Sequence, residues 1–325
     1  MAESLPTNTV QTFALVGIRE DLSDIISNIS PTESPFYSMC RKGKTKSRTP
    51  EWIIDSLAAA TSTNKQIEGY DVEGETGTTP VRVKNIVQLM DKVVSVSTTA
   101  QAVDTAGRSS ELKYQVAKRG QELKRDIEAS ITRNNASVVG NASTAGQLGS
   151  AESWIETNVD RGATGADGGF NSGTGVVDAP TDGTARAATE AQLKAVIRDC
   201  WSAGGDPSVV MVGPFNKQAY SAFAGIATQY KDNGGRSMSR AVILGAADYY
   251  VSDFGEHKIV PNRFSRDESA LVLDPKLWEI KFLQPFKTTP LAKTGHNDKR
   301  LLSVELTLCC KNEAGNGIVA DLTTS

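Results

Sequence analysis

The side chains of this 325-residue chain that are best suited to catalysis are two histidines, His257 and His296. A serine or cysteine nucleophile needs a histidine beside it as a base, and an acid that orients the histidine. Neither histidine lies in a motif of that kind, so we expect both at exposed loop or strand-end positions. The sequence therefore predicts no catalytic residue and no enzymatic activity.

Metal, disulfide and nucleotide chemistry also lack the residue patterns they require. The four cysteines contain no Cys-x-x-Cys pair, which argues against zinc and disulfides and favours reduced thiols; they are Cys40, Cys200, Cys309 and Cys310. Gly43-Lys44-Thr45 resembles the end of a phosphate-binding loop, but Ser38 stands where that motif needs glycine, and Pro50 follows. The glycine-rich stretch 162–175 has no G-x-G-x-x-G. The sequence predicts no cofactor.

Opposite charges are concentrated in two stretches of the N-terminal third. The basic stretch (residues 41–48) contains Arg41, Lys42, Lys44, Lys46 and Arg48, and the acidic stretch (residues 68–75) contains Glu68, Asp71, Glu73 and Glu75. The acids could form a calcium loop, but the glycine at 74 falls in the wrong place, which leaves a solvated loop tip or an inter-subunit contact. The basic stretch could touch DNA but has no interleaved aromatic residues. Our hypothesis is that the two stretches meet across subunits.

The composition of the chain limits the classes of protein to which it can belong. Hydrophobic residues make up 39% of the chain, below the usual share for a globular domain, which suits an extended shape that buries surface against neighbours. The net charge of −3 creates no basic field for nucleic acid. No apolar run reaches the roughly 18 residues of a membrane span, and the first residues do not read as a signal peptide.

The elements that carry these residues can be predicted from periodicity. Residues 1–50 read as an arm with a short helix near 19–28, and strands are expected over 51–57 and 81–99, joined by a polar loop. The clearest helix is expected over 109–134, with an apolar stripe on which Gly120 suggests close backbone approach. A long loop over 137–188 precedes alternating helices and strands. The predicted strands lie near 209–212, 248–253, 257–261, 270–273, 278–283 and 299–311.

Several phrases of the sequence resemble the major capsid proteins of tailed double-stranded DNA phages that have the Hong Kong 97-like shell fold. The two most informative are REDLSDIISNISPTESPF at 19–36 and MVGPFNKQ at 211–218. Further matches are VSDFG at 251–255, VPNRF at 260–264, LVLDP at 271–275, LAKTG at 291–295 and GIVADL at 317–322. They occur in the same order, and the resemblance covers nearly the whole chain.

The resemblance implies an α+β fold with five segments. These are an N-terminal arm (1–50), an extended two-stranded β loop (51–99), a peripheral domain with a long spine helix at 109–134 (100–185), an axial domain (186–262), and strands returning to the peripheral domain (263–325). Some relatives carry a cleaved N-terminal scaffold segment; this chain begins almost at the arm, so we expect none.

The resemblance also implies a structural function. The subunits would form hexamers and pentamers of an icosahedral head in the virion, assembled in the bacterial cytoplasm around double-stranded DNA that they enclose without sequence-specific contact. Its partners would be copies of itself, the portal protein, and scaffolding and decoration proteins, with no membrane. Two alternatives are a cellular nanocompartment shell of the same fold, signalled by a neighbouring cargo-enzyme gene, and an ordinary soluble enzyme, signalled by a monomer in solution.

Overall fold

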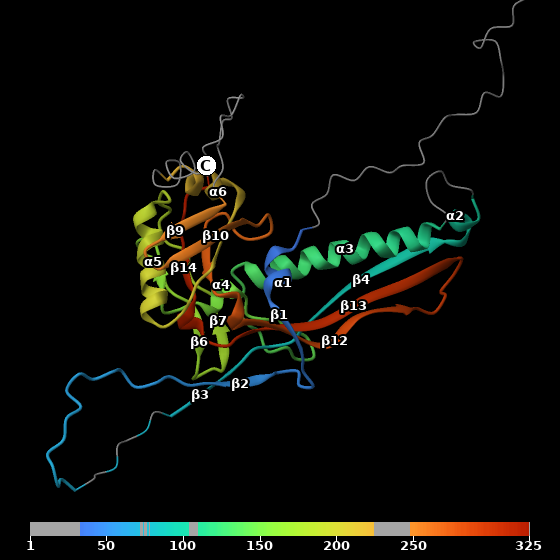
Figure 1. The fold of residues 1–325 in the computed structure, drawn as a ribbon. Coiled ribbons are helices and arrows are strands. Elements are labelled where there is room, and N and C mark those ends of the chain that lie inside the picture. The colour runs from blue at the N-terminus through green and yellow to red at the C-terminus, as the bar shows by residue number, and fades with distance from the viewer. Residues whose placement is uncertain are drawn as a thin grey trace, which may run out of the picture.

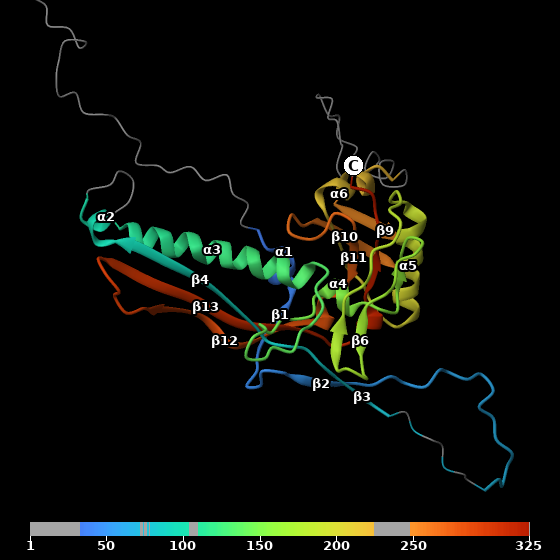
Figure 2. The ribbon, with the colours of Figure 1, turned by 180° about the vertical axis from the view of Figure 1, so that it is seen from behind.

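The structure, a computed structural model, describes residues 33–71, 74, 77, 79–103, 110–223 and 248–324. The fold is α+β and is built on two main sheets. An elongated body carries a long helix above a four-stranded sheet, and a more compact body beside it carries a six-stranded sheet (Figure 1). A thin loop leaves the underside of the molecule and runs outward on the side of the compact body (Figure 2).

The elongated body is a helix lying along one face of a sheet. The sheet has the order β1-β12-β13-β4, formed by β1 (Arg41–Lys44), β12 (Trp278–Pro290), β13 (Asn297–Cys310) and β4 (Gln88–Ser97). The strands β4, β13 and β12 are antiparallel, and β1 runs parallel to β12 at the edge. Helix α3 (Glu111–Thr132) covers one face, and α2 (Thr98–Ala102) closes the far end (Figure 1).

Helix α3 forms where the apolar stripe predicted a helix over 109–134. Its N-cap is Ser110, whose hydroxyl accepts from the backbone N–H of Lys113. Leu123, Ile127 and Ile131 are fully buried against the inward residues of β4 and β13. The regular alternation of β13 places Leu302, Val304, Leu306 and Leu308 on that inner face. The side of the helix that faces solvent is charged, so the apolar packing against the sheet is what holds the helix in place.

Gly120 of α3 does not serve the close backbone approach that its place on the stripe suggested. The atom nearest to an added Cβ would be Leu302 Cδ2 at 3.8 Å, an ordinary van der Waals contact with a side chain. Glycine therefore costs helix stability here without a packing reason.

Gly120→Ala is expected to stabilise the subunit by about 1 kcal/mol, because alanine restricts the unfolded chain and fits the helix. Urea unfolding of the dissociated subunit would measure it. Gly205→Ala is the matched control, since its Cβ would lie 2.5 Å from the Gly315 backbone and should destabilise. A loss of stability at position 120 comparable to that at 205 would refute this account of the helix.

The compact body holds the six-stranded sheet. Its order is β5-β14-β11-β8-β10-β9, formed by β5 (Val159–Asp160), β14 (Gly317–Val319), β11 (Ala270–Leu273), β8 (Val209–Val212), β10 (Gly255–Pro261) and β9 (Tyr249–Ser252). Helix α5 (Glu190–Ser202) begins at a capping box made by Thr189 and Gln192, and α6 (Pro214–Ser221) begins with a proline in its first turn. Both helices bury apolar residues in the core of this body.

Two strand assignments differ from the sequence-based expectation. The strand expected over 81–99 is two strands: β3 (Val81–Lys84) pairs with β2 (Glu51–Ile54), and β4 joins the four-stranded sheet. Asn85 causes the break, because its buried side chain donates to the carbonyls of Gly149 (3.0 Å) and Leu308 (2.7 Å). The segment 263–325 is shared between bodies: β12 and β13 lie beneath α3, whereas β11 and β14 lie in the six-stranded sheet.

The segment 137–188, expected to be a long loop, is ordered by packing within its own subunit. It contains α4 (Ala151–Trp154), all of whose residues are buried, and a hairpin of β6 (Gly169–Asn171) and β7 (Val176–Asp178). Trp154 stacks on Phe170 with ring centroids 5.9 Å apart. Its low apolar content hid this structure, since the few apolar residues that anchor it, among them Leu148, Trp154 and Val177, are dispersed among polar residues.

Candidate inter-subunit contact surfaces

The loop that joins β2 to β3 carries hydrophobic side chains that the subunit itself does not cover. Leu57 is 98% exposed and Ile67 is 82% exposed, and Tyr70 in the loop and Ile53 in the adjoining strand β2 are also exposed. The described part of this loop runs away from both bodies (Figure 2). Large apolar groups grouped on an extended segment indicate an interaction surface, because water contact with them is unfavourable.

The first half of the basic stretch 41–48 forms β1, the edge strand of the four-stranded sheet, so this part of the arm is held against the subunit. Arg41, Lys42 and Lys44 belong to β1, and Lys46 and Arg48 follow it; all five are exposed. Lys42 is used within the subunit, since its Nζ lies 3.8 Å from the centre of the Tyr37 ring and donates to the Cys40 carbonyl. The other four cations are accessible to a partner.

The acidic stretch 68–75 is only partly described. Glu68 and Asp71 are exposed on the extended loop, whereas Glu73 and Glu75 lie outside the described residues. Within the described part of the chain, no ion pair joins this stretch to residues 41–48. The described end of the loop lies well away from β1 (Figure 1), so any contact between the two stretches requires a second subunit.

The residues considered for chemistry are placed as follows. His257 is buried, not exposed as expected: Nδ1 is 2.5 Å from the Pro207 carbonyl and Nε2 is 2.7 Å from Ser252 Oγ, and burial lowers its pKa. His296 is exposed. All four cysteines are buried and free. Among the described residues, no group of three or more metal-ligating side chains is brought together, and no helix is long and apolar enough to cross a bilayer.

Glu128 is a buried carboxylate that connects three parts of the subunit, and it was not among the residues identified from the sequence. Its carboxylate accepts from the backbone N–H groups of Phe36 and Tyr37, both at 2.8 Å, at the start of α1 (Pro35–Met39). It also accepts from Asn262 Nδ2 at 2.7 Å, directly after β10. Burial raises the pKa of Glu128, and these three donors oppose that shift. One side chain thus joins the arm, the long helix and the compact body.

A second buried carboxylate ties the same two bodies together. Glu152 of α4 contacts Arg266 Nη1 at 3.1 Å and Ser269 Oγ at 3.3 Å, just before β11. Arg266 also pairs with Asp182 at 2.6 Å and with Glu268. Burial raises the pKa of Glu152 to about 7, against the opposing effect of Arg266. The two bodies are therefore joined by hydrogen bonds and ion pairs at defined points.

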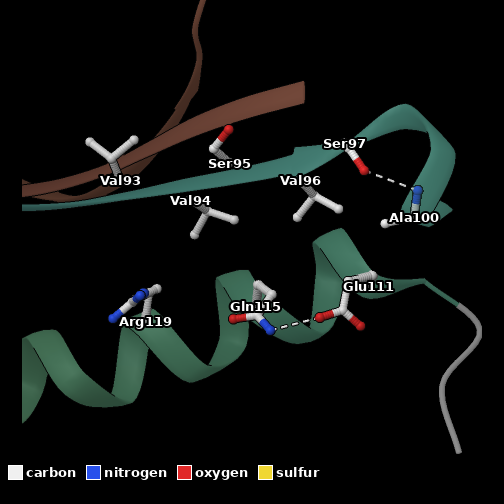
Figure 3. A pocket seen from close by; sticks show the side chains of 9 residues that line it. All are labelled: Val93, Val94, Ser95, Val96, Ser97, Ala100, Glu111, Gln115 and Arg119. Atoms are coloured by element: carbon white, nitrogen blue, oxygen red, sulfur yellow. Dashed lines mark hydrogen bonds between the residues drawn. The ribbon is translucent and has the colours of Figure 1, made fainter. Parts of the chain in front are cut away.

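A groove of about 390 Å³ opens between β4 and the first turns of α3. Figure 3 shows Val94 and Val96 on the strand facing Glu111, Gln115 and Arg119 on the helix. Gln115 Nε2 donates to Glu111 Oε1 at 2.7 Å across this face. The groove is a widening of the helix–sheet interface, and its lining has no arrangement suited to a reaction.

Comparison with known proteins shows why this subunit has exposed contact surfaces and no pocket suited to a reaction among its described residues. The model of the SU10 major capsid protein family matches residues 5–323. The chain belongs to the SU10 major capsid protein family. A similar protein is the major capsid protein of Escherichia phage Phieco32, 26% identical over 336 residues that cover 93% of this chain and 94% of that one. This capsid protein is a structural component of the phage virion and not an enzyme.

Solved phage capsids share the fold. The cyanophage A-1(L) capsid subunit matches with a TM-score of 0.64 at 15% identity, covering 97% of this chain and 99% of that one. A chain of the phage G structure, which comprises gp27 major capsid proteins and gp26 decoration proteins, matches with a TM-score of 0.55 at 9% identity, covering 99% and 100%. The fold is therefore the Hong Kong 97-like capsid fold. Its membership of the major capsid protein family shows that the protein forms the icosahedral phage capsid. The matching family and the Phieco32 relative are phage major capsid proteins, and they favour a phage capsid over a cellular nanocompartment.

Proposed function

We propose that this capsid protein builds its shell from hexamers and pentamers in which the extended loop of each subunit lies over a neighbour. The proposal rests on the exposure of two large apolar side chains of this loop, Leu57 (98%) and Ile67 (82%), in the single subunit. An isolated two-stranded excursion is marginally stable in water, so its natural place is on another surface. Copies of the same chain supply that surface throughout a closed shell.

The two bodies would then take different places in each capsomer. We assign the peripheral domain to α3 with the four-stranded sheet, and the axial domain to the six-stranded sheet with α5 and α6. Residues 33–50 belong to the arm, and residues 51–84 to the extended loop. Compared with the sequence-based boundaries, β4 moves from the loop to the peripheral domain, and β11 and β14 move to the axial domain.

The assembled shell would enclose double-stranded DNA, and its further partners are the portal and scaffolding proteins. Decoration proteins are a further class of partner, and the structure that contains the phage G capsid protein includes them. A shell tolerates weak individual contacts, because each subunit is held by several neighbours at once. Modest charge pairing between subunits therefore has a measurable effect on assembly.

Charge reversal tests the pairing of the two stretches. Lys44→Glu with Lys46→Glu is expected to raise the protein concentration needed for shell formation about tenfold, because each exposed pair is worth about 0.2–1 kcal/mol. Adding Glu68→Lys and Asp71→Lys should restore assembly. Electron microscopy and light scattering across a concentration series would measure both.

Lys42 is left unchanged in this test because it contacts Tyr37 within the subunit. Lys258→Glu, at an exposed site on β10, is the control for a general effect of charge. Unchanged assembly of the Lys44 and Lys46 variant, or no recovery in the four-residue variant, would rule out the pairing and leave the loop contact to be tested separately.

A further inference from the structure

We propose that the outward face of α3 is a phosphate-binding surface that contacts the packaged double-stranded DNA, so that this face of the subunit lines the interior of the shell. This proposal rests on the proposed enclosure of DNA. The surface, here called the α3 basic face, consists of Lys113, Lys118, Lys124 and Arg125. The three lysines are exposed, and none of them forms an ion pair with an acid in the part of the chain that the structure describes.

The charges of α3 are segregated around the helix axis. At 3.6 residues per turn the four cations lie within an arc of about 140°. Lys118 and Arg125 lie opposite the buried stripe of the helix, and Lys113 and Lys124 lie on its flank. The acids of the helix are engaged elsewhere. Asp126 pairs with Lys92 of β4 at 2.6 Å, and Glu122 pairs with Arg119 at 2.5 Å. Glu128 is buried beneath α1, and Glu111 faces the groove of Figure 3. The positive face is therefore not neutralised by its own helix.

The dimensions of this face suit a nucleic-acid backbone. Lys113 and Arg125 are twelve residues apart, which corresponds to about 18 Å along the helix axis. Duplex DNA presents one phosphate charge per about 1.7 Å of its axis, so several phosphates lie within that length. Backbone contact requires only cations and gives no sequence preference. That fits a lining that must accept any packaged sequence.

The same face is poorly suited to a protein partner. Protein interfaces are built around buried aromatic and apolar side chains. Helix α3 is described along its whole length, and none of its exposed side chains is a large hydrophobic residue. Between the lysines lie Ala117 and Gln121, which offer little to a protein surface. An acidic scaffolding helix would find charge here but no apolar anchor, so DNA is the better match.

Lysine acetylation on intact particles tests the contact. DNA-filled heads and the same heads after DNA release would be labelled briefly and digested, and labelling at Lys113, Lys118 and Lys124 would be compared by mass spectrometry. We expect labelling of these lysines to be several-fold lower in filled heads, with Lys194 and Lys276 changing little. Equal labelling in the two particles would overturn the proposal. Precursor shells that have not yet packaged DNA would be labelled as a third sample, and protection confined to them would also overturn the proposal and would indicate a scaffolding protein instead.

A binding measurement on the full-length chain gives an independent readout. Affinity for a 30-base-pair duplex would be followed against salt for the wild type and for the Lys113→Gln, Lys118→Gln, Lys124→Gln variant. The slope of log affinity against log salt should fall in magnitude by about 0.9 for each phosphate that is no longer neutralised, or about 2.7 for all three lysines.

The charge-matched control changes Lys194, Lys258 and Lys276 to glutamine, and an equal effect in that control would refute the assignment. If no shells form at all, the proposed function fails instead. Shells that package DNA but show neither lysine protection nor a change in the salt dependence of DNA binding refute only the DNA contact.

Discussion

Glu128→Ala is expected to lower the free energy of unfolding of the subunit by about 3 kcal/mol and to release α1 from α3. The mutation removes the acceptor of three hydrogen bonds and leaves the N–H groups of Phe36 and Tyr37 and the amide of Asn262 without that acceptor. Each buried donor without an acceptor costs about 1–3 kcal/mol, and relaxation recovers part of that cost. Denaturant unfolding of the dissociated subunit measures the total effect.

Hydrogen exchange of the backbone amides separates the loss of this junction from general destabilisation. We expect Phe36 and Tyr37 to lose protection far more than the core strand β11 does. Glu128→Gln keeps the shape but turns one acceptor into a donor, so its effect should be smaller than that of alanine. Glu122→Ala is the control, because its ion pair is partly exposed and worth at most about 1 kcal/mol. An alanine variant at 128 as stable as the one at 122 would show that the arm is held by other contacts.

Leu57→Asp combined with Ile67→Asp is expected to abolish shell formation while leaving the subunit folded. Burying one such side chain contributes about 1.5–3 kcal/mol, and every extended-loop contact in the shell would lose two of them and gain two charges. The subunit should be unaffected because both side chains are exposed in it. Electron microscopy for shells and circular dichroism for folding measure the two effects.

Ser62→Asp supplies the matched control, since it adds a charge to an exposed polar position of the same loop. It should assemble at close to the wild-type concentration. Normal shells from the Leu57 and Ile67 variant would mean that the loop lies free in solvent, and the proposed contact between neighbours would have to be abandoned.

The long helix and the strands of the cores could be predicted from the sequence because each carries a repeated apolar pattern. The stripe of Leu123, Ile127 and Ile131 and the alternation in β13 have direct counterparts in the structure. Asn85 broke an apparently continuous strand through contacts with Gly149 and Leu308, which are distant in the sequence. Such a contact has no local signal.

The candidate surfaces were predictable only in part. The charged stretches were visible as composition, but the use of Lys42 by Tyr37 was not, because it depends on how α1 turns into β1. Glu128 had a usable signal: an acid flanked by Ile127 and Ile131 on the apolar side of a helix must find hydrogen-bond donors. His257 was placed wrongly because a buried histidine bonded to a backbone carbonyl looks like any other histidine in sequence.

The most direct test of the central claim is a cryo-electron microscopy map of shells assembled from this chain. The account predicts closed shells of hexamers and pentamers in which residues 55–71 lie on the adjacent subunit and Leu57 and Ile67 are buried there. Closed shells in which this loop projects into solvent with both side chains exposed would contradict it.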